Sequence, residues 1–310
     1  MSNSRLLSNN SHRIYSPGKL MLTSEYFAVD GALVLAVPTM LGQEFFFEET
    51  ADGKSLVFWE AYHQNKLWLK ATIDYKSWRI VETNISSSAE FILQTLKNVQ
   101  NLSDIKFKNT DSYHLKTNLQ FPSDYGLGSS STLMTNLAEW SQSNPFQLNT
   151  ISLGGSGYDI AVAHSKSAVL FQNKPKIHFT KVDFNPKFKN ELIFIHLNQK
   201  QNSREGIQLY RSKEKNRDLI EEFSLLTQQI FKSENLEEFS DLLTLHENKL
   251  SFFLGIETVK EKYFENCPVF VKSLGAWGGD FVLSCKFPGF EDYFQGKGFS
   301  TIFNWSDLIV

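Results

Sequence analysis

Cysteine is scarce in this chain, because only Cys267 and Cys285 occur among 310 residues. Two cysteines are too few for a disulfide framework, and their spacing is not that of metal ligands. We therefore expect two buried thiols in a reducing compartment.

Long apolar segments are also missing. No uninterrupted run reaches the ~18 apolar residues that cross a bilayer. The opening residues, MSNSRLLSNNSHR, lack the apolar core of a signal peptide. We expect a cytoplasmic protein with no membrane partner.

Neither sign of charge is in large excess. Lys and Arg number 31 and Asp and Glu 34, which gives a formal net charge of −3. A protein that binds nucleic acid or an anionic membrane over a broad surface usually carries a positive excess, so no nucleic-acid partner is expected. With 41% hydrophobic residues the composition is that of an ordinary soluble chain. A small molecule is the expected partner of a monomer or homodimer.

The most informative stretch is PSDYGLGSSST, from Pro122 to Thr132. Gly126 and Gly128 lead into Ser129 to Ser131, and the apolar residues that follow recur at helical spacing, so the serines are expected in the first turn of a helix. Glycines let the backbone approach a phosphate, and the unpaired N–H groups of a helix start favour an anion. The loop indicates a nucleotide triphosphate site, although a simple capping loop fits the same residues.

Strands and helices are expected to follow a different order in the two halves of the chain. In the first half, strands are expected at 56–59, 66–73 and 113–119, with helices after residues 87 and 131. In the second half, strands are expected at 192–197, 269–274 and 281–285, and helices at 218–231 and 236–254. The second order predicts an α+β domain with helices on one face of an antiparallel sheet. The turn at Asn185-Pro186 places the boundary between the halves near 186–190.

Three glycine-bearing segments stand in order along the chain: SPGKLMLTSEYFAVDG (16–31), PSDYGLGSSST (122–132) and KSLGAWGGDFVLS (272–284). They resemble the three motifs of the GHMP kinases, the superfamily of small-molecule kinases that includes galactokinase, homoserine kinase, mevalonate kinase and phosphomevalonate kinase. The family pattern Pro-x-x-x-Gly-Leu-Gly-Ser-Ser-Ser/Ala is matched in full from Pro122 to Ser131. A fourth segment, GGSGYDIAVA (154–163), resembles the loop that carries the family's catalytic aspartate. The resemblance extends over nearly the whole chain.

This resemblance implies an α+β fold of two domains. Residues 1–187 would form an ATP-binding domain like the second domain of ribosomal protein S5, and residues 188–310 a ferredoxin-like domain. The implied activity is ATP-dependent transfer of the γ-phosphoryl group to an alcohol, with ATP and Mg²⁺ as cofactors. Mevalonate is the first expected acceptor, because of the chain length and the helix before the third motif. Phosphomevalonate is the alternative, because Ser24-Glu25-Tyr26 stands where the family usually has Gly-Glu-His.

The resemblance also implies roles for individual residues, since phosphoryl transfer needs a held triphosphate and a positioned hydroxyl. Asp159 would be the general base, and Lys19 would pair with it and keep it ionised. An Asx turn at Asp159 and a solvated lysine after a Pro-Gly turn are the plain alternatives. Ser130 would be a ligand of Mg²⁺. The phosphates would be cradled by Gly126, Leu127, Gly128, Ser129, Ser130 and Ser131.

Further residues belong to the acceptor side or to the third motif. Glu25 occupies the position of the first-motif glutamate, and the third motif would contribute Gly275, Gly278 and Gly279. Ser203 and Arg204 stand at an expected helix start, where they could meet a carboxylate or phosphate of the substrate, although a helix cap and a surface arginine are the favoured plain interpretation. The cations considered for a phosphorylated acceptor are Lys200, Arg204, Arg211 and Lys272.

Two departures from the family pattern affect the expected site. Trp277 interrupts the glycines of the third motif and is expected to narrow the pocket or to change how the loop closes. Between Ser131 and Asp159 the only acidic residue is Glu139, which lies roughly 12 Å along the helix from the phosphates at about 1.5 Å per residue, too far to bind their metal. Two rival functions remain: a non-catalytic regulator of the same fold that binds a nucleotide or metabolite, and a decarboxylase of the superfamily.

Overall fold

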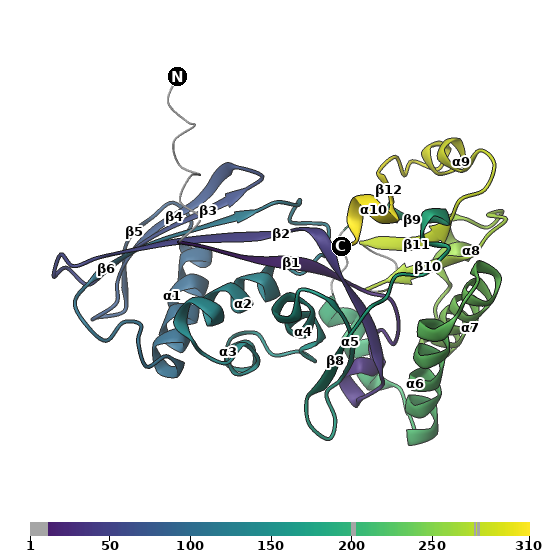
Figure 1. The fold of residues 1–310 in the computed structure, drawn as a ribbon, viewed down its shortest axis with the longest axis horizontal. Helices are drawn as coiled ribbons and strands as arrows, with labels where there is room; N and C mark the ends of the chain where they lie inside the picture. The colour runs from purple at the N-terminus through teal and green to yellow at the C-terminus, as the bar shows by residue number, and fades with distance from the viewer. Residues whose placement is uncertain (1–11, 200–202, 276, 278–279) are drawn as a thin grey trace. The chain divides into compact units, whose positions relative to one another are not determined.

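The structure, a computed structural model, describes residues 12–199, 203–275, 277 and 280–310 (Figure 1). Contacts within the chain divide it into two compact units. The first unit comprises Met1–Pro17, Leu41–Ser123 and Gly128–Gly155, and the second comprises Gly18–Met40, Asp124–Leu127 and Ser156–Val310. This grouping places the first motif from Gly18 onward with the C-terminal half of the chain. The division into domains 1–187 and 188–310 stays a prediction.

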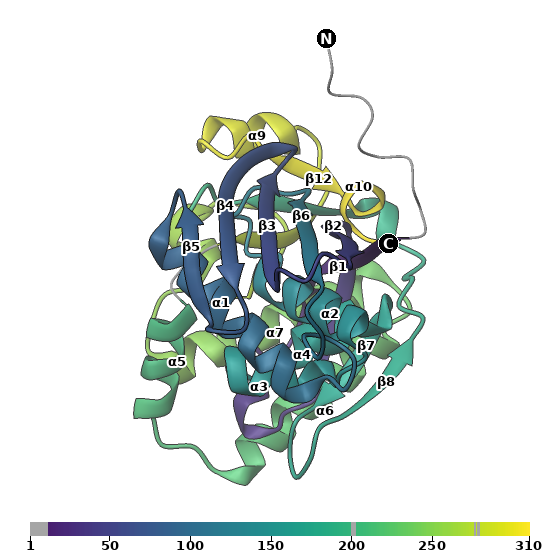
Figure 2. The same ribbon diagram turned by 90° about the vertical axis from the view of Figure 1, so that its left-hand side faces the viewer.

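The first unit contains a mixed sheet with the strand order β5-β4-β3-β6-β2 (Figure 2). The strands are β2 (Val34–Thr50), β3 (Leu56–His63), β4 (Lys66–Asp74), β5 (Arg79–Thr83) and β6 (Ser112–Leu119). Neighbouring strands are antiparallel except β3 and β6, which are parallel. The strands expected at 56–59, 66–73 and 113–119 are therefore confirmed.

Three helices of the first unit, α1 (Ser86–Leu102), α2 (Ser129–Ser141) and α3 (Pro145–Ser152), lie on one face of this sheet (Figure 1). Aromatic side chains fill the space between them: Phe45, Trp59 and Tyr113 are at most 1% exposed, and the ring of Trp140 packs edge-on against Phe45 and Tyr113. This core fixes the place at which α2 begins.

Strand β1 (Arg13–Met21) pairs with β2, and the two approach closely at Gly42. A Cβ atom at Gly42 would lie 2.3 Å from the carbonyl oxygen of Ser16 and 2.6 Å from the hydroxyl of Tyr15. Only a residue without a side chain fits between the two strands here.

The second unit contains an antiparallel sheet with the strand order β10-β11-β9-β12. Its strands are β9 (Leu192–His196), β10 (Val271–Leu274), β11 (Phe281–Cys285) and β12 (Ile302–Asn304). The same unit holds β7 (Ala168–Gln172), which pairs with the start of β2, and β8 (His178–Val182), which pairs with β7. The antiparallel sheet expected in the second half of the chain is confirmed.

The helices of the second unit include α6 (Arg217–Lys232) and α7 (Leu236–Leu254), which pack together while α7 contacts β10. Helix α7 ends at Gly255, whose φ of 71° is left-handed, as its sequence predicts. The other helical segments are η2 (Phe27–Asp30), α4 (Tyr158–Ser165), η3 (Lys189–Glu191), α5 (Ser203–Ser212), α8 (Val259–Tyr263), α9 (Phe290–Gly296) and α10 (Trp305–Leu308).

Both thiols, Cys267 and Cys285, are free and buried, as expected. Among the helices that the structure describes, none has the length and apolar character needed to cross a bilayer.

The close approach at Gly42 gives a test of the fold. We expect Gly42→Ala to lower the free energy of unfolding by about 1–3 kcal/mol, because the methyl group must push β1 away from β2. The measurement is urea denaturation. The control is Gly296→Ala, since a Cβ atom at Gly296 meets nothing within 4 Å. Equal urea midpoints for Gly42→Ala and Gly296→Ala would contradict the close packing of β1 against β2 at Gly42.

Candidate active site

Helix α2 begins with an open N-terminus. Its N-cap is Gly128, with φ 87°, and no side chain caps the first turn. The hydroxyl of Ser131 is buried and donates to the carbonyl oxygen of Gly128 at 2.8 Å, so Ser131 supports the turn itself. Ser129 is half-buried and Ser130 is exposed, and neither hydroxyl makes a hydrogen bond to another described residue. The N–H groups of this turn and two hydroxyls are thus left for an anion.

A cavity of about 340 Å³ adjoins this helix start within the first unit. Ser129 and Ser130 form part of its lining. Its aromatic lining residues are Trp59, Tyr62, His63, Trp68 and Phe91. A space of this size holds a small ligand, and aromatic faces favour a flat heterocycle. No local sequence pattern indicates this cavity, because its lining residues come from four strands, β2, β3, β4 and β6, and from the helices α1 and α2.

In the second unit, the first motif contacts the glycine loop directly. Lys19, in β1, donates from its backbone N–H to the carbonyl oxygen of Leu127 at 2.9 Å and from Nζ to the carbonyl oxygen of Gly126 at 3.0 Å. Gly126 has a φ of 65°, a left-handed conformation that favours glycine. The side chain that the sequence assigned to phosphoryl transfer therefore lies against the loop that it was expected to serve.

Lys19 also interacts with the start of α4. This helix follows Gly157, whose φ is 91°, and Asp159 stands in its first turn. The ring of Tyr158 lies with its centroid 5.4 Å from Nζ of Lys19. The structure thus brings Lys19 and Asp159 together in one cluster, to which Tyr158 also belongs.

Opposite charges hold the ammonium group of Lys19 in its charged form. Burial alone would lower the pKa of Lys19, but Tyr158 and the carboxylates of Asp159 and Asp280 outweigh burial and raise the pKa above its ordinary value. Burial raises the pKa of Tyr158, so its phenol is neutral near pH 7. The charges that face Lys19 are therefore those of the two aspartates.

Asp280 is a member of this cluster that the sequence analysis missed. It is 9% exposed, and its carboxylate lies against Gly126, because a Cβ atom on Gly126 would be 2.0 Å from Oδ2. The signal was present in the third motif, where an acidic residue directly follows the glycines. Gly275 has a φ of 78°, and a Cβ atom there would be 3.7 Å from the same oxygen.

The remaining expected site residues are placed as follows. Ser203 is the first residue of α5, as expected, and Arg204 follows it in the same turn. Gly278 and Gly279, like Lys200, lie outside the described residues. Trp277 is half-buried, and its indole Nε1 donates to the carbonyl oxygen of Glu257 at 3.0 Å.

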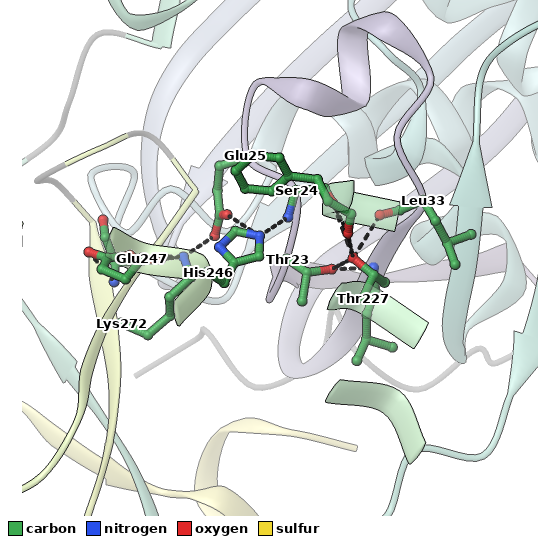
Figure 3. A network of polar contacts seen from close by, with 11 residues as sticks. Thr23, Ser24, Glu25, Leu33, Thr227, His246, Glu247 and Lys272 are labelled. Atoms are coloured by element: carbon green, nitrogen blue, oxygen red, sulfur yellow. Dashed lines mark hydrogen bonds and ion pairs between the residues drawn. The ribbon is translucent and has the colours of Figure 1, made fainter. Parts of the chain in front are cut away.

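Glu25 and Lys272 are the centre of a buried charge cluster in the second unit (Figure 3). Nζ of Lys272 lies 2.7 Å from Oε1 of Glu25 and 3.2 Å from Oε2 of Glu247, and all three side chains are at most 3% exposed. Lys272 is therefore paired inside the protein, and the expectation that it serves a phosphorylated acceptor is wrong. Sequence reasoning could not distinguish it from an exposed lysine.

His246 ties the same cluster to the first motif. Its Nε2 accepts a hydrogen bond from the backbone N–H of Ser24 at 2.8 Å, so the proton of the neutral ring is on Nδ1. Burial and the charge of Lys272 hold the pKa of His246 well below its ordinary value. Beside it, the hydroxyls of Ser24, Thr23 and Thr227 form a chain of hydrogen bonds (Figure 3). These contacts hold Ser24 at a left-handed φ of 61°.

One ammonium group cannot compensate two buried carboxylates. Burial raises the pKa of Glu25, although Lys272 opposes the shift. Burial also raises the pKa of Glu247 to about 7, against the effect of Lys272 and with that of Glu25. The cluster therefore exchanges a proton near neutral pH.

This shift predicts a pH-dependent stability. Well below pH 4.5, Glu247 is protonated in both the folded and the unfolded state, and between about pH 4.5 and about pH 7 the folded chain retains a proton that the unfolded chain has released. The contribution of Glu247 to the free energy of unfolding thus falls as the pH rises through this window. Glu247→Gln removes the titration and keeps an acceptor for the N–H of Ser273. We expect its stability relative to the parent protein to increase from about pH 5 to about pH 8.

Urea denaturation across this range measures the difference. The control is Glu237→Gln, an exposed glutamate on the same helix. If the free energies of unfolding of Glu247→Gln and the parent protein differ by the same amount at every pH in this range, Glu247 does not titrate there.

Neither a family model nor a curated protein sequence matches the chain, whereas solved structures do. The mevalonate kinase of Methanococcus jannaschii is similar with a TM-score of 0.67 and 18% identity, over 96% of this chain and 98% of that one. The phosphomevalonate kinase of Streptococcus pneumoniae, in complex with phosphomevalonate and AMPPNP, gives 0.66 and 15%, over 95% and 96%. The galactokinase of Lactococcus lactis, complexed with galactose, gives 0.62 and 13%, over 93% and 88%.

These proteins are GHMP kinases, and each is matched over most of both chains. At these identities the similarity concerns the fold, and it agrees with the family that the motifs resemble. The chain is a protein of the GHMP kinase fold.

Proposed function

We propose that the protein is an ATP-dependent kinase that transfers the γ-phosphoryl group of ATP to a hydroxyl group of a small molecule. The observation that carries this proposal is the contact of Lys19 with the glycine loop and its interaction with Asp159. If Asp159 were only a helix cap and Lys19 only a solvated lysine, neither the contact with the loop nor the interaction between the two residues would be needed. The fold supports the proposal, since similar structures are those of kinases.

The nucleotide would be held by the backbone around the start of α2. The uncapped N–H groups of the first turn are the proposed donors to the phosphates of the nucleotide. The aromatic cavity beside Ser129 and Ser130 is the proposed binding place of the nucleobase. No described group of three or more His, Cys, Asp or Glu side chains is arranged to hold a metal ion. Mg²⁺ needs few protein ligands when phosphates and water complete its shell, so the free, exposed hydroxyl of Ser130 fits it. When bound, the ion supplies charge neutralisation to the phosphates.

Asp159 is the proposed general base, which takes the proton of the acceptor hydroxyl as that oxygen attacks the γ-phosphorus. Lys19 contributes a fixed positive charge beside it, which favours the ionised carboxylate. Because Nζ of Lys19 also donates a hydrogen bond to the carbonyl oxygen of Gly126, Lys19 fixes the position of Asp159 relative to the glycine loop. Lys19 thus positions Asp159, and Asp159 removes the proton of the acceptor hydroxyl. Phosphoryl transfer requires little other chemistry from the protein.

Mevalonate is the proposed acceptor. A phosphorylated acceptor needs more cations in the site, and the burial of Lys272 removes one of the four cations considered for it. Phosphomevalonate stays the alternative, since the first motif has Glu25-Tyr26 and the M. jannaschii mevalonate kinase and the S. pneumoniae phosphomevalonate kinase are about equally similar to this chain. A cytoplasmic location and a monomeric or homodimeric state stay predictions from the sequence.

The test is ADP release with ATP and Mg²⁺ in the presence of mevalonate, phosphomevalonate, diphosphomevalonate, homoserine or galactose. We expect turnover on mevalonate, and Asp159→Asn should lower kcat by at least about 100-fold while ATP affinity changes little, because the base acts only in the chemical step. The control is Asp183→Asn, an exposed aspartate of the same unit.

Two outcomes would reject parts of the proposal. Unchanged turnover in Asp159→Asn would remove Asp159 as the base. Binding of ATP without turnover on any acceptor would favour a regulator of the same fold.

A further inference from the structure

Tyr26 and Trp277, which both depart from the motif pattern, meet in the structure. The hydroxyl oxygen of Tyr26 accepts a hydrogen bond from the backbone N–H of Trp277 at 2.8 Å. Tyr26 is 8% exposed, so this hydrogen bond is shielded from water. The first motif thereby holds the backbone of the third-motif loop directly.

The same hydroxyl touches helix α5. A Cβ atom at Gly206 would lie 2.3 Å from the hydroxyl oxygen of Tyr26 and 2.6 Å from Cε1. The helix approaches this closely only because residue 206 has no side chain. The ring of Tyr26 stacks on Tyr210 of α5, with centroids 6.2 Å apart, and both belong to one apolar cluster. Tyr26 is therefore enclosed by α5 and by the third-motif loop.

The position of Tyr26 is itself fixed. Its φ of 64° is left-handed, which is unusual for a tyrosine, and its neighbour Glu25 is paired with Lys272. Lys272 belongs to β10, the strand that leads into the third motif. Two consecutive residues of the first motif thus hold the third motif at two places, its strand and its loop.

The third motif reaches the glycine loop at its other end, where the carboxylate of Asp280 lies against Gly126. Two described residues of the third motif, Trp277 and Asp280, thus contact Tyr26 and Gly126, respectively. Helix α5 begins at Ser203, on the proposed acceptor side.

We propose that Tyr26 is a positioning residue that couples helix α5 to the third-motif loop. Its hydroxyl fixes the backbone of Trp277, and Gly206 lets α5 rest on that hydroxyl, so α5 and the third-motif loop share one contact. This role rests on the proposed function for its catalytic consequence and on the geometry alone for the coupling.

The coupling is tested without any substrate. The protein has six tryptophans, so labelling with 5-fluorotryptophan gives one fluorine resonance for each, and Trp277→Phe assigns that of Trp277. We expect Tyr26→Phe to shift this resonance, since the backbone of Trp277 loses its acceptor. Gly206→Ala should shift it too, and by less when Tyr26→Phe has already removed the hydroxyl.

Tyr210→Phe is the matched control. It removes a hydroxyl from the same apolar cluster, one that donates to Asp30 at 2.8 Å and not to the third motif. It should leave the resonance of Trp277 in place. An unmoved resonance in Tyr26→Phe, or an equal shift in Tyr210→Phe, would overturn the coupling.

A second measurement tests the consequence for catalysis. Tyr26→Phe should raise the KM for ATP about threefold to tenfold, the effect expected for one lost hydrogen bond, with a smaller change in kcat. A purely structural role would instead lower the melting temperature and leave KM unchanged. If the Trp277 resonance moves but no acceptor is phosphorylated, the coupling stands and the proposed function fails. If turnover is found and neither resonance nor KM changes, the coupling alone fails.

Discussion

The sharing of one ammonium group by two buried carboxylates is the constraint on which the arrangement of the candidate site depends. Lys272, Glu25 and Glu247 come from β10, the first motif and α7, and none of the three is exposed enough to be compensated by water. Burying charges costs more than most contacts return, and a buried ion left without its partner costs about 3–5 kcal/mol. The three segments can therefore pack together in few ways. The first motif is held next to the third as a result.

The surroundings of this cluster extend its effect. His246 accepts from the backbone of Ser24, and the hydroxyls of Thr23 and Thr227 continue the network toward α6. A turn with two left-handed residues that are not glycine, Ser24 and Tyr26, is unfavourable by itself. Its polar groups find partners only in this packing, which is how a strained turn becomes a fixed part of the fold. Lys19 precedes the turn in the same motif and presents its ammonium group to the glycine loop.

Much of this could be predicted from the sequence, because it is encoded locally. Glycine spacing and the apolar period that follows it predicted the helix start after Gly128, and Gly255 predicted the end of α7. The resemblance to a family predicted the fold, and it predicted that Lys19 and Asp159 lie together. The misassigned Lys272 shows the limit, since burial depends on residues from distant segments and a lysine carries no local sign of it. The aromatic cavity was missed for the same reason, whereas Asp280 was missed although it directly follows the glycines of the third motif.

Three structural constraints act on Gly126. Its backbone is left-handed, its carbonyl oxygen receives Lys19, and the space where a side chain would begin is filled by the carboxylate of Asp280. A side chain at position 126 would be strained by the left-handed backbone and would also displace the carboxylate of Asp280, although the two positions are far apart in the chain. A substitution of Gly126 therefore disturbs the third motif as well as the glycine loop.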